Sequence, residues 1–259
     1  MDERKNYSDE RENIQTRPSV ECKDSVSAKE KKQGKGKEKK HDILEPANKK
    51  GRHVNKLLFF LRFVLLPVVW LLFPFRFYGN RRIPDGPYIY IGNHYRLWDV
   101  AYPACTTTEG IHYLAKSELR NVPVVGAACR GAKVIFLERN GEDMRGVMDA
   151  LRCLKNGEKV AIYPEGKRNK SEDGEMLEFH SGAAMLAIKT RTPIVPIVCY
   201  KKTKPFRLNH ILIGEPFELK EYYGQKLTQE LLAEADEKLR NHMIEMREEH
   251  TRMLAAKKS

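Results

Sequence analysis

Much of the fold follows from Ile91-Gly-Asn-His-Tyr-Arg-Leu-Trp-Asp-Val100, where a short apolar run is followed by a histidine and, five positions later, by an aspartate. In a continuous helix, His94 and Asp99 would be rotated by about 140° from each other and their side chains would diverge. They can meet only if His94 lies in a loop after a strand and Asp99 lies in the first turn of the next helix. The imidazole could then take a proton near neutral pH, while the carboxylate fixes its tautomer and stabilises the cation.

The sequence has no Gly-x-Ser-x-Gly elbow and no other credible nucleophile to accompany this pair. The proton that His94 takes could therefore belong to the substrate. This favours direct transfer onto a bound hydroxyl over a covalent enzyme intermediate. The alternative is a purely structural histidine, because a single histidine beside a strand is commonly hydrogen-bonded or solvated.

Two later apolar runs end on charged residues. The run Val134-Ile-Phe-Leu-Glu-Arg-Asn140 ends on Arg139, and Val160-Ala-Ile-Tyr-Pro-Glu-Gly-Lys-Arg-Asn169 ends on an acidic residue, a glycine and two cations. Arg139, Lys167 and Arg168 could converge on one anion, since the arginine fork matches phosphate oxygens. Gly166 would let the backbone approach a ligand closely. Taken singly, each of these cations could equally be a solvated charge at the end of a strand.

Four blocks in order resemble the glycerolipid acyltransferase family, and within it the 1-acylglycerol-3-phosphate acyltransferases, which make phosphatidic acid. The blocks are Asn93-His94 through Asp99, Phe136-Leu-Glu-Arg139, Tyr163-Pro-Glu-Gly-Lys-Arg-Asn169 and Ile194-Val-Pro-Ile197. The resemblance covers about residues 80 to 215. This chain departs from the family pattern at Tyr163, Lys167 and Asn169, where the family carries Phe, Thr and Ser.

The resemblance implies that His94 is the general base and Asp99 its orienting partner. The residues that it implies for acceptor binding are Arg139, Glu165, Gly166, Lys167 and Arg168, and those for an acyl groove are Val195, Pro196 and Ile197. The implied partners are a lysophospholipid acceptor and an acyl thioester donor, carried by coenzyme A or by acyl carrier protein. The implied chemistry needs no metal and no redox cofactor.

The composition favours anionic partners. The 259 residues carry a formal net charge of +12 and have a pI near 9.4, which suits a phospholipid surface or nucleic acid. No helix-turn-helix or interleaved aromatic pattern supports specific nucleic-acid binding. Five scattered cysteines without a Cys-x-x-Cys motif fit reduced, packed thiols.

The N-terminal part is expected to associate with a membrane. Residues 1–53 form a charge-dense stretch typical of a disordered tail, and residues 29–56 hold eleven Lys or Arg against four Asp or Glu. Residues 54–80 form a hydrophobic segment in which 57–75 favour a helix or helical hairpin in one leaflet, with a single span as the alternative. We expect an anionic membrane surface as partner and an active site that faces the cytoplasm.

Residues 81–259 are expected to form an α/β domain with a largely parallel sheet flanked by helices. The predicted strands are 88–91, 111–115, 133–137, 159–163, 194–199 and 211–213. The predicted helices are 97–107, 117–130, 142–155 and 180–190, followed by an amphipathic helix over 228–253 with Leu232, Ala235, Leu239, Met243 and Met246 on one stripe. In such a sheet the ligand site forms at the carboxyl ends of the strands.

The sequence leaves other functions open. Within the enzyme class, the acceptor could be glycerol-3-phosphate or another lysophospholipid. A protein of the same fold that binds without catalysis is a second alternative, although intact His94 and Asp99 argue against it. A basic protein that binds a membrane or nucleic acid without catalysis is the third.

Overall fold

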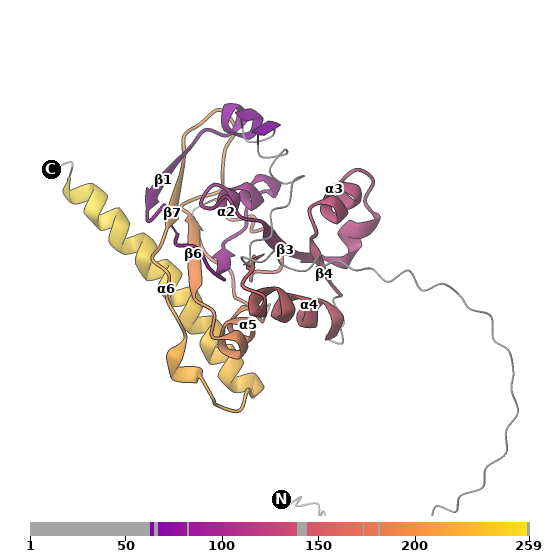
Figure 1. The fold of residues 1–259 in the computed structure, drawn as a ribbon. Helices are drawn as coiled ribbons and strands as arrows, with labels where there is room; N and C mark the ends of the chain where they lie inside the picture. The colour runs from indigo at the N-terminus through magenta and orange to yellow at the C-terminus, as the bar shows by residue number, and fades with distance from the viewer. Residues whose placement is uncertain are drawn as a thin grey trace, which may run out of the picture. The chain divides into compact units, whose positions relative to one another are not determined.

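The computed structural model describes residues 63–64, 67–81, 83–138, 144–172, 174–180 and 182–257. The predicted tail 1–53 and Arg139 lie outside this part of the chain. A seven-stranded sheet has the order β1-β7-β6-β2-β5-β3-β4, with helices on both faces (Figure 1). Its strands are β1 (Phe75–Gly79), β2 (Ile89–Gly92), β3 (Ile111–Lys116), β4 (Ile135–Leu137), β5 (Lys159–Ile162), β6 (Ile194–Cys199) and β7 (Asn209–Ile213). The helices are η1 (Leu97–Val100), α2 (Ala101–Ala104), η2 (Ser117–Asn121), α3 (Val125–Gly131), α4 (Met144–Lys155), α5 (Ala183–Thr190), η3 (Lys220–Tyr222) and α6 (Gln229–Ala256).

The sheet is largely parallel, which confirms the predicted α/β class. Strands β6, β2, β5, β3 and β4 pair in parallel, whereas β7 is antiparallel to β6 and carries β1 parallel to itself. Neighbours β2 and β5 end in register, with Ile91 opposite Ile162. The loops that follow them therefore leave the sheet side by side at the carboxyl ends of the strands, where a parallel sheet places its ligand site.

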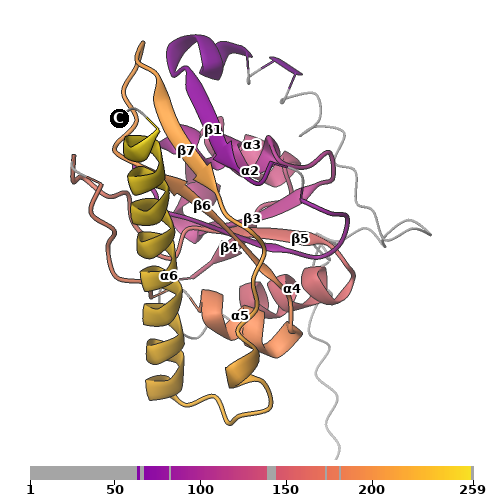
Figure 2. The same ribbon diagram turned by 90° about the vertical axis from the view of Figure 1, so that its left-hand side faces the viewer.

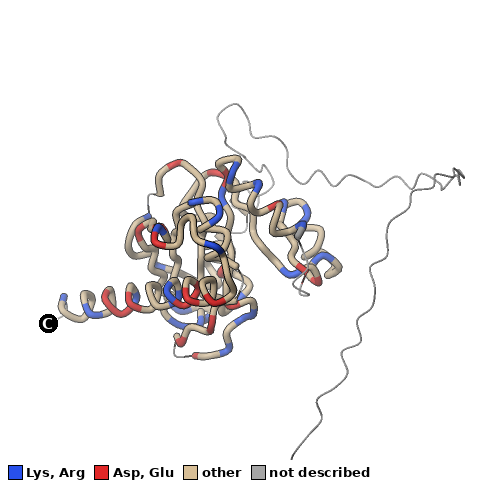
Figure 3. Tube along the Cα trace, turned by 90° about the horizontal axis from the view of Figure 1, so that it is seen from below, with Lys and Arg blue, Asp and Glu red and all other residues tan. Residues whose placement is uncertain are grey.

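The central strands are apolar because both faces of the sheet are covered. Ile89 and Ile91 pack into the core that contains α4, α5 and α6, while Tyr90 packs into a second core on the opposite face with Tyr102 of α2. The stripe predicted on the last helix is confirmed as packing, with Ala235, Leu239 and Met243 buried and Leu232 and Met246 partly buried against the same core. Acidic and basic residues are interspersed along the rest of α6 (Figure 3).

The predicted membrane segment 57–75 ends earlier than expected. Residues 67–72 are helical, and the edge strand β1 already begins at Phe75, opposite Asn209 of β7 (Figure 2). Pro74 explains the change, because proline disfavours helical backbone in the residue before it. Phe75 and Phe77 then pack edge-on against Tyr102, at 5.6 Å and 6.2 Å between ring centroids. Among the described residues, no helix combines the length and apolarity needed to cross a bilayer.

Candidate active site

The predicted pairing of His94 with Asp99 is confirmed. His94 lies in the loop after β2, and Asp99 lies in η1, the first helical turn that follows. The His94 Nδ1 and an Asp99 carboxylate oxygen, Oδ2, are 3.3 Å apart. The histidine is partly accessible whereas the aspartate is buried. This is the arrangement that a base and its orienting carboxylate require, with the histidine open to a substrate and the carboxylate shielded from water.

Asp99 is held in place by the backbone. Its Oδ2 accepts hydrogen bonds from the N–H groups of Tyr95 and Arg96, each at 2.6 Å. A carboxylate can only accept, so His94 donates its Nδ1 proton toward Asp99 and keeps the lone pair on Nε2. Nε2 is therefore the atom that can take a proton from a substrate.

Asn93, to which the sequence assigned no role of its own, fastens this loop to the sheet. Its side-chain amide donates to the carbonyl of Cys199 at 2.9 Å, and its side-chain oxygen accepts from the N–H of Cys199 at 2.8 Å. Asn93 thus bonds the end of β6 much as another strand would. The loop that carries His94 is consequently fixed at its first residue.

Tyr163, a departure from the family pattern, supports the site directly. Its ring lies 4.6 Å from the imidazole of His94, centroid to centroid, and its hydroxyl donates to the backbone carbonyl of Asp99 at 2.8 Å. A Cβ on Gly92 would lie 2.9 Å from this ring, which explains the glycine at that position. The extra hydroxyl therefore adds a link between the β5 loop and η1 that phenylalanine could not provide.

Glu165, predicted to bind the acceptor, is buried. Its Oε1 accepts the backbone N–H of His94 at 3.4 Å. The neighbouring Asn169 donates its own N–H to the His94 carbonyl at 2.6 Å. Burial, with a smaller contribution from the nearby Asp99 carboxylate, raises the pKa of Glu165 to about 7, although the His94 N–H, the Asn169 side chain and the charge of Arg240 each lower it. Glu165 therefore helps to hold the backbone of the loop that carries His94, and its predicted contact with the acceptor stays a prediction.

We expect the stability of Glu165→Gln, measured against that of the wild type, to be higher at alkaline pH than at acidic pH. The pKa of Glu165 is raised from 4.5 to about 7, so the stability that its neutral form provides is complete below pH 4.5 and is lost as the pH rises through 7. The full shift corresponds to at most about 3 kcal/mol. Thermal unfolding of both proteins at pH 5 and pH 8 measures the effect, and a difference between them that does not change with pH would contradict it.

The predicted phosphate-binding cations follow β5. Gly166 has a φ of +61°, which glycine adopts without strain, and it forms the turn that presents Lys167 and Arg168 to solvent. Arg168 directly precedes Asn169, which is bonded to His94. Convergence with Arg139 stays a prediction, because Arg139 lies outside the described residues. The predicted acyl-groove residues Val195, Pro196 and Ile197 are buried within β6.

An apolar cavity of about 550 Å³ opens beside the pair. It begins at Tyr163, Leu97 and Trp98, which adjoin His94 and Asp99, and it reaches Thr107 and Ile111 at the start of β3. The cavity therefore extends along the strands, from the carboxyl ends near His94 toward their amino ends. Its remaining lining is Val69, Val100, Ala101, Ala104, Thr108, Glu109, Gly110, Tyr113, Leu114, Ala115, Leu119, Val124, Val125, Ala128, Cys129, Ala132 and Val134. The predicted residues 195–197 do not line it.

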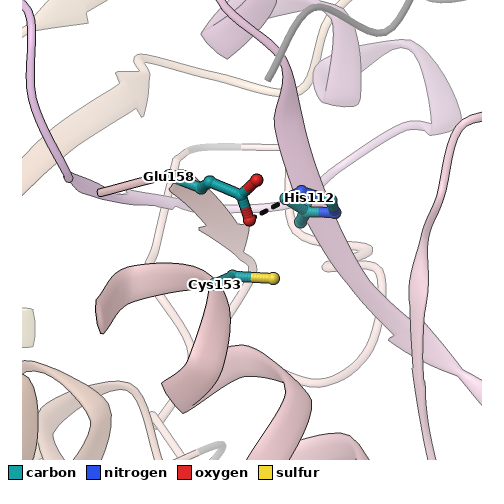
Figure 4. Close-up of side chains that lie close together, drawn as sticks. All are labelled: His112, Cys153 and Glu158. Carbon is teal, nitrogen blue, oxygen red and sulfur yellow. Dashed lines mark ion pairs between the residues drawn. The ribbon is translucent and has the colours of Figure 1, made fainter. Parts of the chain in front are cut away.

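One group among the described residues has metal-ligand spacing, and it lies away from His94. His112, Cys153 and Glu158 hold their ligand atoms within 4.8 Å of one another where β3 and β5 begin (Figure 4). His112 Nε2 and Glu158 Oε2 are 3.4 Å apart, and His112 Nδ1 lies 3.1 Å from the carbonyl of Lys133. Burial and the Glu158 carboxylate raise the pKa of Cys153, which favours a thiol over the thiolate that binds metals. We interpret the group as a buried polar link between β3, β5 and α4.

The fold and motifs match known proteins. Residues 74–200 match the family model "Acyltransferase". The chloroplastic 1-acyl-sn-glycerol-3-phosphate acyltransferase BAT2 of Brassica napus is 35% identical over 125 residues, which are 46% of this chain and 35% of that protein. The human 1-acyl-sn-glycerol-3-phosphate acyltransferase alpha is 34% identical over 160 residues, or 58% of this chain and 53% of that protein.

A solved structure agrees with these relatives. The crystal structure of the 1-acyl-sn-glycerophosphate (LPA) acyltransferase PlsC from Thermotoga maritima matches with a TM-score of 0.55 and 26% identity, covering 74% of this chain and 81% of that one. The alignments with the plant and human relatives span 35% and 53% of those proteins, so the similarity concerns the shared domain.

Proposed function

We propose that this chain, whose residues 74–200 match the "Acyltransferase" family model, acylates the free hydroxyl of 1-acylglycerol-3-phosphate to give phosphatidic acid. The observation that carries the proposal is the pairing of His94 with a buried Asp99 beside residues that line an apolar cavity. Exposed Lys167 and Arg168 follow the neighbouring strand. A proton acceptor, a site for a hydrocarbon chain and cations for a phosphate are the three parts that this reaction needs.

In the proposed mechanism, His94 Nε2 takes the proton of the acceptor hydroxyl as its oxygen attacks the carbonyl carbon of the acyl thioester. Asp99 stabilises the imidazolium that forms. The tetrahedral intermediate collapses, the carbon–sulfur bond breaks, and the thiolate leaves with the proton that His94 returns. The acyl group passes directly to the acceptor oxygen. The donor would be acyl-CoA or acyl-acyl carrier protein.

The cavity suits the acyl chain of the donor or the acceptor. Its volume of about 550 Å³ falls in the range of pockets that enclose small ligands. Apolar side chains line most of it, so transfer of a hydrocarbon chain from water into it is favourable. Because it begins beside Tyr163 and ends near the start of β3, the chain would extend away from the reacting carbonyl.

Filling the far part of this cavity should shift the chain-length preference. Ala104 lines the cavity at the end of α2, just before Thr107. We expect Ala104→Phe to lower kcat/KM for long-chain donors by roughly 10- to 200-fold, the range for methylene-scale misfits in apolar pockets. Short-chain donors should be much less affected. Ala233→Phe, at an exposed position on α6, is the matched control. Equal losses of kcat/KM for donors of all chain lengths would show that this cavity does not hold the acyl chain.

We further propose that the protein works at an anionic membrane surface with its active site facing the cytoplasm. Its substrate would be a membrane lipid, and the net charge of +12 favours anionic headgroups. The predicted segment 54–80 would contribute to attachment. Residues 54–62 lie outside the described part of the chain.

The test of the proposed function is an acceptor panel. Purified protein receives a long-chain acyl-CoA with lysophosphatidate, glycerol-3-phosphate or a lysophospholipid that carries a larger headgroup, and the lipid products are identified. We expect phosphatidate from lysophosphatidate at the highest kcat/KM. A preference for glycerol-3-phosphate would reassign the acceptor, and product from none of them would overturn the proposed activity.

A further inference from the structure

The two most exposed large apolar side chains of the described residues share an unusual backbone. Val124 is 82% exposed and Phe206 is 75% exposed. Both have positive φ, at +64° and +54°. Left-handed backbone is strained for any residue with a Cβ and especially for a β-branched one. Within this domain these two side chains are left largely uncovered, which points to a partner that covers them.

Val124 belongs to the mouth of the apolar cavity. Val124, Leu97 and Trp98 line the cavity and are also exposed, so they stand at its opening. Val122, two residues before Val124, is exposed as well and does not line the cavity. The opening is thus surrounded by apolar side chains that project into solvent.

Phe206 joins this surface through the helical residues 67–72. Its backbone N–H donates to the carbonyl of Leu72 at 2.7 Å. The loop between β6 and β7 and this helix lie side by side in Figures 1 and 2. Phe73, which directly follows Leu72, has its ring centroid 5.7 Å from that of Trp98 at the opening of the cavity. We call Leu97, Trp98, Val122, Val124, Phe206 and Leu208 the apolar rim.

Exposed cations lie within the rim segments. Arg207 stands between Phe206 and Leu208, and Arg120 stands two residues before Val122. Apolar tips alternating with basic side chains suit the boundary between headgroups and acyl chains of an anionic bilayer, where each kind of side chain meets its preferred environment. A bilayer also holds lipids whose chains would fill a cavity that opens there.

We propose that the apolar rim inserts into the acyl boundary of an anionic bilayer, so that the cavity opens into lipid and not into water. The docking itself rests on the exposed side chains of the rim, while the entry of substrate chains through it rests on the proposed function. The N-terminal hydrophobic segment alone would not require contact at Val122 or Phe206. These two positions therefore test the proposal.

Tryptophan quenching by brominated lipids tests insertion without any catalysis. In the full chain with Trp70→Phe and Trp98→Phe, a single tryptophan is placed by Phe206→Trp or by Val122→Trp, neither of which lines the cavity. Met148→Trp, at a position on α4 that is 48% exposed, is the matched control. The vesicles contain phosphatidylcholine brominated along its acyl chains and phosphatidylglycerol.

We expect quenching at 206 and at 122 to exceed quenching at 148 by at least about twofold, because brominated chains quench only an indole that enters the acyl boundary. Quenching at either rim position that does not exceed the control would overturn the proposal, including the case of a rim that binds another protein. An inactive enzyme whose rim is quenched would overturn only the proposed function.

A second measurement links docking to turnover. Phe206→Asp with Leu208→Asp should lower turnover of lysophosphatidate embedded in vesicles by about tenfold or more, with little change for a short-chain acceptor that is monomeric in water. Aspartate tolerates the left-handed backbone at 206, so the loop should keep its conformation. Equal turnover of the embedded acceptor by the variant and the wild type would count against the rim as the route of entry.

Discussion

Replacing His94 with alanine should lower kcat by about 10²–10⁴-fold, the contribution of a positioned general base. The Michaelis constants should change little, because the backbone groups around the site stay in place. His94 is partly exposed and contributes one ring contact with Tyr163, so stability should fall only slightly. Steady-state rates and thermal unfolding of the same preparation separate the two effects.

His210→Ala is the matched control, since His210 is an exposed histidine on β7. It should retain normal turnover. Near-normal turnover in a folded His94→Ala variant would mean that another group takes the proton. A substitution of Asp99 would test catalysis less directly than one of His94, because the Asp99 carboxylate also accepts hydrogen bonds from the N–H groups of Tyr95 and Arg96. Asp99→Asn is therefore expected to weaken the loop and the chemistry together.

Replacing Arg168 with alanine should weaken the use of a phosphorylated acceptor by ten- to over a hundred-fold in kcat/KM, mainly through KM. A charge-assisted hydrogen bond contributes roughly 1.5–3 kcal/mol, which corresponds to that range. Arg168→Lys should restore only part of the loss, because lysine keeps the charge and loses the planar fork. Lys167→Ala should have the smaller effect, since threonine occupies that position in the family pattern.

The measurement compares lysophosphatidate with an uncharged monoacylglycerol. Arg168→Ala should affect the first and spare the second, whereas Lys170→Ala, an exposed lysine two residues along the chain, should affect neither. Equal losses of kcat/KM on both acceptors would show that Arg168 does not bind the acceptor phosphate. The role of Arg139 can be tested in the same assay.

The sequence predicted those parts of the site that depend on local order along the chain. A histidine and an aspartate five positions apart can meet only across a strand-to-helix loop, and that geometry was found at His94 and Asp99. The five other strands of the core were also placed correctly, with ends that differ by a few residues. In each case a short apolar run bounded by charged or turn residues carried the information.

Other features depend on contacts between distant segments and could not be predicted from local pattern. Strand β1 was not predicted from the sequence, because Phe75 and Phe77 continue an apolar run that resembles a membrane helix. The antiparallel direction of β7 follows from how the chain returns to the sheet. The contact of buried Glu165 with the His94 backbone is likewise a property of tertiary structure, which the motif alone did not indicate. The cavity is assembled from segments between Val69 and Tyr163.

The most direct test of the proposed chemistry follows thiol release from acyl-CoA during the first turnover, with and without lysophosphatidate. If His94 activates a bound hydroxyl and the acyl group passes directly to it, thiol should appear only with acceptor and in step with phosphatidate. A burst of thiol equal to the enzyme concentration in the absence of acceptor would contradict this mechanism, because it would show that a side chain of the protein takes the acyl group first.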